Sequence, residues 1–330
     1  MIGLATGFLF TPAVSQTIAP STISDPARNY IENNEPAASA PSSIEEWQEE
    51  FASPLKPGEL MDDVAAVLKL WPVNIELLRI AEAEHILVTP KNAEIQNDER
   101  IVLYVHGGAY VEGRPENHLG ALAMIADLMN VRVLGLRYPL AWQAPFPAAR
   151  DRFLDVYKEL LKNHSPQHIA VAGDSAGGGL AMSSVLRLRD DGMPMPAVLG
   201  LISPWADVSK TGDSMLLASG HDPLIDYDKN LVAAAKLYAG GLSLQDPRIS
   251  PIYDDFNKGF PPTYISTGTR DQFLSHAARL QRKLTDAGIT NSLYVYEGMW
   301  HVFQIAPPVI PEAEAAWRDL AQFLNRHLAR

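Results

Sequence analysis

One serine lies at the centre of a glycine-flanked pentapeptide, Gly173 to Gly177, and its hydroxyl is the first candidate for chemistry in this chain. An apolar run precedes the pentapeptide and residues at helical spacing follow it, so we expect Ser175 at the apex of a sharp strand-to-helix turn. Glycine on both sides allows the close backbone approach that such a turn needs. The pattern is that of a nucleophile elbow. The alternative is an ordinary glycine-rich turn whose serine only caps the helix.

A serine hydroxyl is a weak nucleophile unless a base removes its proton and an acid orients that base. The candidate base is His301, in the loop after a strand expected at 292–297. The candidate acid is Asp271, just after a strand expected at 263–268. In a parallel sheet both loops open at the same edge as Ser175. The alternatives are a structural histidine and an aspartate that only caps the following helix.

A tetrahedral intermediate also needs hydrogen-bond donors for its negatively charged oxygen. The stretch from His106 to Tyr110 follows an expected strand and offers consecutive backbone N–H groups at Gly107 and Gly108. The N–H of Ala176, at the start of the helix after Ser175, is a third candidate donor. We read His106 as a residue that holds the turn, and the alternative for the whole stretch is a glycine-rich turn without a ligand.

Composition limits the partners of the chain. It has 330 residues, 47% of them hydrophobic and 20% charged, which is typical of a soluble globular protein with a sizeable core. Lys and Arg number 27 and Asp and Glu 39, and the net charge of −12 argues against nucleic acid or an anionic membrane as partner. Without cysteine there is neither a disulfide nor a thiolate ligand. We expect no cofactor and no metal.

The N-terminus leaves the localisation open. Residues 2–10 form a short apolar run that resembles the core of an export signal, but no basic residue precedes it. It is too short to span a membrane, and so is every other apolar stretch. The chain is therefore cytoplasmic with a loose apolar arm, or periplasmic or secreted if residues 1–15 are a trimmed or mis-started signal.

The sequence predicts two helices before the first strand. Ser43 and Glu46 form a capping-box pattern that starts the first clear helix, and a second amphipathic helix is expected at 59–70. Their apolar faces need a partner, so residues 1–70 are expected to form an arm and a helical cap over residues 71–330. The turn-rich segment 204–262 is a second place from which a cap could arise.

The positions of the other elements indicate an α/β fold. Strands are expected at 75–81, 85–89 and 101–106, with a polar turn at 91–99 that suggests a hairpin. Thereafter helices and strands alternate, which predicts a mostly parallel sheet wound by right-handed crossovers. The expected helices are 118–129, 147–163, 175–189, 229–238, 272–287 and 312–328, and the expected strands are 131–138, 168–172, 197–203, 263–268 and 292–297.

These motifs together resemble the hormone-sensitive-lipase-like family of α/β-hydrolases, the bacterial family IV esterases. The resemblance covers residues 85–330 and includes the stretches 106–108, 173–178, 145–149, 203–207, 250–253 and 301–304. The elbow sequence is similar to the branch that includes acetyl-hydrolases and monoterpene lactone hydrolases. Ala109 stands where many members have a third glycine.

The resemblance implies an α/β-hydrolase fold with a helical N-terminal cap and an esterase that forms an acyl-enzyme. It assigns the nucleophile to Ser175, the base to His301 and the orienting acid to Asp271. It assigns the oxyanion hole to the N–H groups of Gly107, Gly108 and Ala176.

The expected substrate is a small ester with a short to medium acyl chain. Large apolar side chains could line its pocket or pack in the core or cap: Trp47, Phe51, Tyr110, Trp205 and Met299. A lactone hydrolase or an amidase could use the same machinery, and a non-catalytic small-molecule binder is the alternative of another class. Similar enzymes pair through their last strand, here 292–297, so a homodimer is a further expectation.

Overall fold

The computed structural model describes residues 19–34, 37, 39–41, 43–51, 65, 67–91, 98–305 and 310–329, without the side chains of residues 50 and 51. An eight-stranded sheet runs through the molecule in the order β1-β2-β4-β3-β5-β6-β7-β8. The strands are β1 Val73–Ile80, β2 Ala83–Pro90, β3 Ile101–Val105, β4 Arg132–Leu136, β5 Ile169–Asp174, β6 Val198–Ile202, β7 Thr263–Gly268 and β8 Asn291–Tyr296. From β4 to β8 all neighbours pair in parallel, so the expected α/β-hydrolase class is confirmed.

The first strands pair differently from the prediction. β1 and β2 form an antiparallel hairpin whose tight turn places Ala81 and Glu82 at positive φ. β2 then pairs antiparallel with β4, and β4 lies between it and β3. The hairpin expected across residues 91–99 is therefore wrong, because a parallel crossover inserts β4 beside β2.

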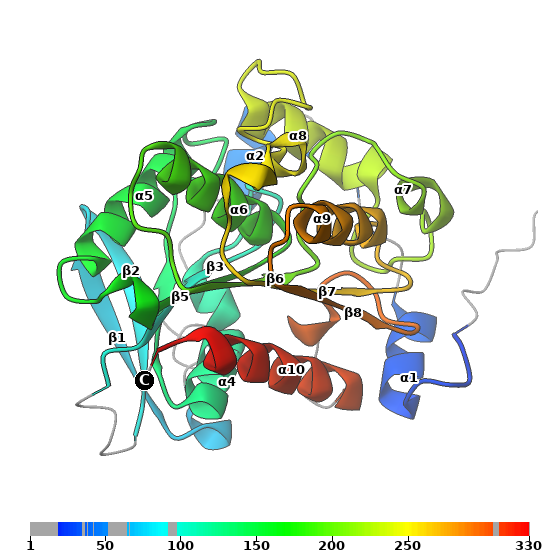
Figure 1. Cartoon of the computed structure of the whole chain (residues 1–330). Coiled ribbons are helices and arrows are strands. Elements are labelled where there is room, and N and C mark those ends of the chain that lie inside the picture. The colour runs from blue at the N-terminus through cyan, green and yellow to red at the C-terminus, as the bar shows by residue number, and fades with distance from the viewer. Residues whose placement is uncertain are drawn as a thin grey trace, which may run out of the picture.

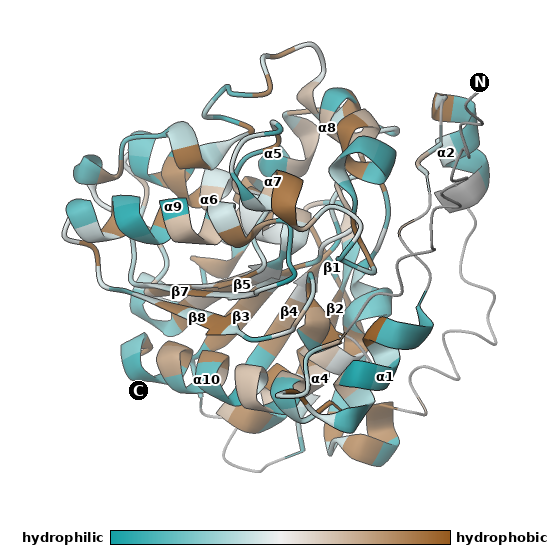
Figure 2. Cartoon of the chain, turned by 90° about the vertical axis from the view of Figure 1, so that its right-hand side faces the viewer, coloured by the Kyte–Doolittle hydropathy of each residue, from teal (hydrophilic) through white to brown (hydrophobic). Residues whose placement is uncertain are grey.

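Helices cover both faces of the sheet (Figure 1). On one side lie α5 Ala148–Leu160, α6 Ser175–Asp190 and α9 Leu274–Asp286, and on the other lie α4 Leu119–Met129 and α10 Pro311–His327. Figure 2 shows hydrophobic strands between helices that carry hydrophilic residues on their outer faces. The strands β3, β5 and β6 are buried along their whole length, which is typical of central parallel strands covered on both faces.

Shorter helical segments lie between these elements and at the N-terminal end of the described chain. They are α1 Asp25–Asn33, α2 Ile44–Phe51, η2 Pro115–His118, η3 Pro166–His168, α7 Ser214–Leu217, η4 Tyr227–Leu231, α8 Val232–Ala239, η5 Pro251–Tyr253, η6 Phe256–Lys258 and η7 Phe303–Ile305. No helix in the described ranges is long and apolar enough to cross a membrane.

The N-terminal region contains one helix that was not expected and one that was. α1 begins at Asp25 with Ser24 as its N-cap, and the Tyr30 ring stacks on Trp300 at 4.3 Å between ring centroids. The first helix was expected only at Ser43, so this expectation is wrong. The Ser43 hydroxyl does accept the Glu46 N–H at 3.1 Å, as the capping pattern predicts. Most of the second expected helix, 59–70, lies outside the described residues.

Candidate active site

The turn between β5 and α6 carries Ser175 in a strained backbone conformation. Ser175 has φ +52°, a region that non-glycine residues rarely adopt and that recurs at functional sites. A Cβ on Gly173 would lie 2.8 Å from the carbonyl oxygen of Val105, and one on Gly177 would overlap the same oxygen. Glycine at both positions is therefore required for β3 and α6 to approach this closely, as the sequence pattern predicts.

The structure brings three predicted side chains into one hydrogen-bonded chain. His301 Nε2 lies 2.8 Å from Ser175 Oγ, and His301 Nδ1 lies 3.1 Å from Asp271 Oδ1. Asp271 is itself fixed, because Oδ1 accepts the Phe273 N–H at 2.8 Å and Oδ2 accepts the Thr267 hydroxyl at 2.8 Å. With its proton on Nδ1, His301 donates to Asp271 and leaves Nε2 to accept the serine proton.

Electrostatics at His301 favour a base with a raised pKa. Burial disfavours the charged imidazolium, but the nearby carboxylates, above all Asp271, outweigh this effect and raise the pKa of His301 above its usual value. Burial works against the charged form of Asp271 too, and His301 with the hydrogen bonds to the carboxylate lowers its pKa. The ionised form of Asp271 is therefore favoured, and an ionised carboxylate at this position can stabilise an imidazolium at His301.

Asp222 is a buried carboxylate at this site that sequence reasoning missed. It accepts the backbone N–H of His301 at 3.0 Å and that of Leu224 at 2.9 Å. Burial, together with the negative charge of Asp271, raises the pKa of Asp222 to about 7. It lies in a turn-rich segment that no expected strand precedes, so no local pattern pointed to its position beside His301.

The glycine loop, residues 106–109, differs from the prediction at one donor. The Gly107 N–H donates to Asp174 Oδ1 at 3.0 Å, so it is already engaged within the protein. Its assignment to the oxyanion hole is therefore corrected. Gly108 and Ala109, both at positive φ, instead line the cavity in front of Ser175. Ala176 lies in the first turn of α6, where a backbone N–H has no intrahelical acceptor.

A cavity of about 450 Å³ opens onto Ser175 and His301. Two separate parts of the chain line this cavity together with the glycine loop. They are Ser39, Ala40 and Trp47 from the N-terminal part, and Leu224, Ile225, Asn230 and Leu231 from the 204–262 segment. These parts touch, since the Ala40 N–H donates to the carbonyl oxygen of Lys229 at 2.9 Å.

The predicted pocket residues separate into those at the cavity and those in the core. Trp47 is among the lining residues. Tyr110, Trp205 and Met299 are not, and this is a correction, because all three are at most 1% exposed. Tyr110 stacks on Tyr238, Trp205 stacks on Phe273 and Met299 packs in the cluster around Trp300. The Phe51 side chain lies outside the described part.

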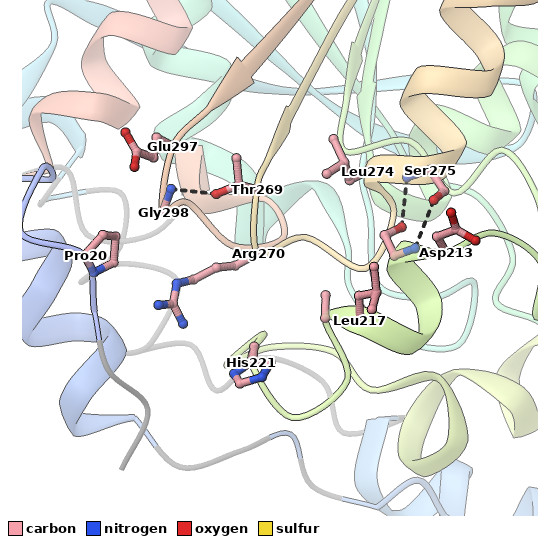
Figure 3. Close-up of a pocket in the computed structure, with 12 residues that line it drawn as sticks. Pro20, Asp213, Leu217, His221, Thr269, Arg270, Leu274, Ser275, Glu297 and Gly298 are labelled. Carbon is pink, nitrogen blue, oxygen red and sulfur yellow. Dashed lines mark hydrogen bonds between the residues drawn. The ribbon is translucent and has the colours of Figure 1, made fainter. Parts of the chain in front are cut away.

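A second cavity, of about 500 Å³, is lined by residues of the loop after β7, the segment around α7 and the turn after β8 (Figure 3). Arg270 and His221, each next to an aspartate that contacts His301, line it together with Thr269. Its lining contains neither Ser175 nor His301, so of these two cavities the one of about 450 Å³ is the one that reaches both side chains. In the described ranges no three His, Asp or Glu side chains are grouped to hold a metal ion.

The chain is similar to known proteins in both sequence and fold. Residues 102–305 match a family model described as an α/β-hydrolase fold. The chain is 32% identical over 275 residues to an esterase of Acinetobacter venetianus, covering 82% of this chain and 89% of that protein. It superposes on a crystallised esterase with a TM-score of 0.85, at 36% identity over 100% of this chain and 99% of the other. A crystallised esterase of the bacterial hormone-sensitive lipase family superposes with a TM-score of 0.75, at 32% identity. That superposition covers 87% of this chain and 97% of the other.

Proposed function

Because this chain belongs to the α/β-hydrolase family, among its hormone-sensitive-lipase-like esterases, we propose that its carboxylic-ester hydrolysis runs through Ser175, His301 and Asp271. The protein is a serine carboxylesterase. The observation that carries the assignment of residues is the continuous hydrogen bonding from Ser175 Oγ to His301 Nε2, and from His301 Nδ1 to Asp271.

In the first half of the reaction Ser175 Oγ attacks the ester carbonyl carbon while His301 Nε2 takes the hydroxyl proton. The carbonyl oxygen becomes an oxyanion, for which the N–H groups of Gly108, Ala109 and Ala176 are the donors that we propose. When the intermediate collapses, the bond to the alcohol oxygen breaks and His301 gives its proton to the departing alcohol. The acyl group then remains on Ser175.

In the second half a water molecule replaces the alcohol. His301 removes one proton from the water as its oxygen attacks the acyl carbon, and the same oxyanion donors stabilise the second intermediate. Collapse releases the carboxylic acid and returns the proton to Ser175 Oγ. Asp271 holds the imidazole in one tautomer throughout both steps.

The cavity supports an ester with a short to medium acyl chain. Its volume of about 450 Å³ lies in the lower part of the range for small-molecule pockets. Trp47, Ile225 and Leu231 give it apolar walls for an alkyl chain. We propose that residues 1–70 and 204–262 together form the cap over the catalytic domain, so that substrate choice depends on both.

A series of substrates tests this proposal. Rates are compared for p-nitrophenyl esters from acetate to palmitate, for aliphatic lactones and for anilides of the same acids. We expect kcat/KM to be highest for acyl chains of short to medium length. A preference for lactones or anilides would replace the esterase assignment with the lactone hydrolase or amidase alternative, and no turnover of any substrate would favour a binder.

A homodimer through β8 is a separate part of the proposal. β8 is one of the two edge strands of the sheet, and Val295 on it is 45% exposed. An unpaired edge strand offers backbone groups to a second copy. Light scattering on the purified chain tests this: twice the monomer mass, lost on Val295→Pro, is the expected result, and a monomer at micromolar concentration would contradict it.

A further inference from the structure

Asp174, the residue before Ser175, links the nucleophile elbow to the glycine loop. Its carboxylate is buried, with the residue 2% exposed, and Oδ1 accepts the Tyr104 hydroxyl at 2.8 Å and the Gly107 N–H at 3.0 Å. A Cβ on Gly107 would overlap Oδ2. The Asp174 carboxylate thus contacts the loop that carries the proposed oxyanion donors. Its backbone is bonded directly to that of Ser175, the proposed nucleophile.

His118 approaches the same carboxylate from η2. Its Nε2 lies 3.5 Å from Asp174 Oδ1 and its Nδ1 lies 3.3 Å from the Arg114 carbonyl oxygen. Both ring nitrogens therefore face acceptors, and only the doubly protonated imidazolium can donate to both. His118 also lines the cavity in front of Ser175.

His85 provides an internal comparison. It is fully buried, but its Nε2 faces the Ile80 carbonyl oxygen at 3.1 Å and its Nδ1 accepts the Arg137 N–H at 3.0 Å. A neutral imidazole satisfies both contacts, and burial lowers the pKa of His85 to about 4. The arrangement around His118 is different because neither of its contacts is a donor.

The charges around His118 also favour the pair. Asp174 from β5 and Glu112 and His106 from the loop after β3 face it, with the His106 ring centroid 5.6 Å away and that of Tyr104 6.1 Å away. Burial opposes the charged form of His118, but Asp174 outweighs it and raises the His118 pKa. Burial also opposes the charge on Asp174, whose pKa is nevertheless lowered by His118 and the Tyr104 hydroxyl.

We propose that Asp174, charge-paired with His118, is a positioning residue that holds the glycine loop against the nucleophile elbow. This inference rests on the proposed function of Ser175 as the nucleophile. Transition-state stabilisation by backbone donors depends on their placement to within a fraction of an ångström. By fixing Gly107, Asp174 fixes where the following N–H groups of Gly108 and Ala109 lie relative to Ser175 Oγ.

The test replaces the charge and keeps the shape, with Asp174→Asn. Asp207→Asn is a matched control, because Asp207 is also fully buried and accepts hydrogen bonds from the same three kinds of donor. These donors are the Tyr253 hydroxyl at 2.7 Å, the Ser209 backbone N–H at 3.0 Å and the Arg279 guanidinium at 2.9 Å. Both substitutions remove one buried ion-paired carboxylate. Only the first is expected to change the oxyanion donors.

Two assays separate positioning from stability. The first measures kcat and KM for p-nitrophenyl butyrate, and the second measures the inhibition constant of a trifluoromethyl ketone, which forms a hemiketal oxyanion with Ser175. For Asp174→Asn we expect kcat to fall roughly 100-fold with KM within about twofold, and ketone affinity to fall in parallel. For Asp207→Asn we expect a lower Tm, with kcat, KM and the inhibition constant of the ketone all within about twofold of the wild type.

His118→Gln keeps the proposal falsifiable if Asp174→Asn does not fold. It removes the cation from the cavity wall, and we expect lower kcat and weaker ketone binding. The double variant should recover part of both losses, because the neutral amide that replaces the Asp174 carboxylate no longer needs a cationic partner. Folded Asp174→Asn or His118→Gln with unchanged ketone affinity would overturn the inference. If Ser175→Ala were active, the proposed function itself would fail, and the two failures are thereby distinguished.

Discussion

The two sides of Ser175, the proposed nucleophile, balance their buried charges differently. On the nucleophile side the Asp174 carboxylate lies beside the His118 imidazole, and the pKa shifts of the two favour an ion pair. On the base side two carboxylates contact His301: Asp271 faces Nδ1 of the imidazole, and Asp222 accepts the backbone N–H. The pKa of Asp222 rises to about 7 there, first because of its burial and also because of the neighbouring Asp271.

This difference in charge indicates that the two sides have different functions in the reaction. The balanced pair on the nucleophile side holds backbone in place and has no need to change its charge during turnover. The base side must accept and release a proton, and the second carboxylate makes that side sensitive to pH. Substitutions on the two sides should therefore differ in what they change, one in oxyanion stabilisation and the other in the pH profile.

The largest effect is expected at the hydrogen bond where the two sides meet, between Ser175 and His301. Ser175→Ala removes the nucleophile, and kcat for p-nitrophenyl butyrate should fall by about 10⁶-fold, with the fold and Tm nearly unchanged. Steady-state rates at high enzyme concentration measure this. Full activity in the variant would remove the basis of the comparison.

Asp271→Asn should give the next largest loss. The amide can no longer stabilise the imidazolium and favours the wrong tautomer of His301, so kcat should fall by about 10⁴-fold. The same rate assay checks this, with circular dichroism as the control for folding. A loss of less than tenfold would mean that Asp222 can serve as the orienting acid instead.

Gly107→Ala probes the nucleophile side. The added methyl group would overlap Asp174 Oδ2 and lie 3.1 Å from the Ser175 Cβ, so the glycine loop must shift. We expect kcat to fall roughly 100-fold and stability to fall by about 1–3 kcal/mol, measured by rate assay and urea unfolding. Gly120→Ala is the matched control, because nothing lies within 4 Å of its Cβ; unchanged kcat in both variants would contradict the placement of the loop.

Asp222→Asn should give the smallest loss of rate and a change in the pH profile. His301 must be neutral to act as base, so activity declines as pH falls through its raised pKa. Removing one carboxylate that raises this pKa should move the acid limb of kcat/KM to lower pH. Asparagine keeps an acceptor for the His301 N–H, so the alkaline plateau should change by no more than about 1 kcal/mol in activation free energy. An unchanged acid limb would contradict the coupling.

Sequence patterns predicted those parts of the site that local chemistry restricts. Gly173 and Gly177 are needed because the backbone of β3 lies against them, and this requirement is visible in the pentapeptide itself. His301 and Asp271 follow strands whose parallel arrangement brings their loops to one edge. The parallel part of the sheet was predicted for the same reason, since buried strands alternate with amphipathic helices.

The errors arose where a position depends on a distant contact. The direction of the Gly107 N–H is set by Asp174, 67 residues away, and no local pattern shows it. Tyr110, Trp205 and Met299 are large and apolar, which suits a pocket and a core equally well, and the tertiary structure placed them in the core. Asp222 contacts His301 across 79 residues of sequence.

Labelling with an organophosphonate tests the central claim most directly. Ser175 Oγ, deprotonated by His301, displaces the leaving group of a p-nitrophenyl phosphonate and forms a stable bond to phosphorus. Intact mass and peptide mapping should show one adduct per chain, on Ser175, in step with the loss of esterase activity, and none in Ser175→Ala. An adduct on another residue, or an active wild-type enzyme that takes no label, would contradict the account.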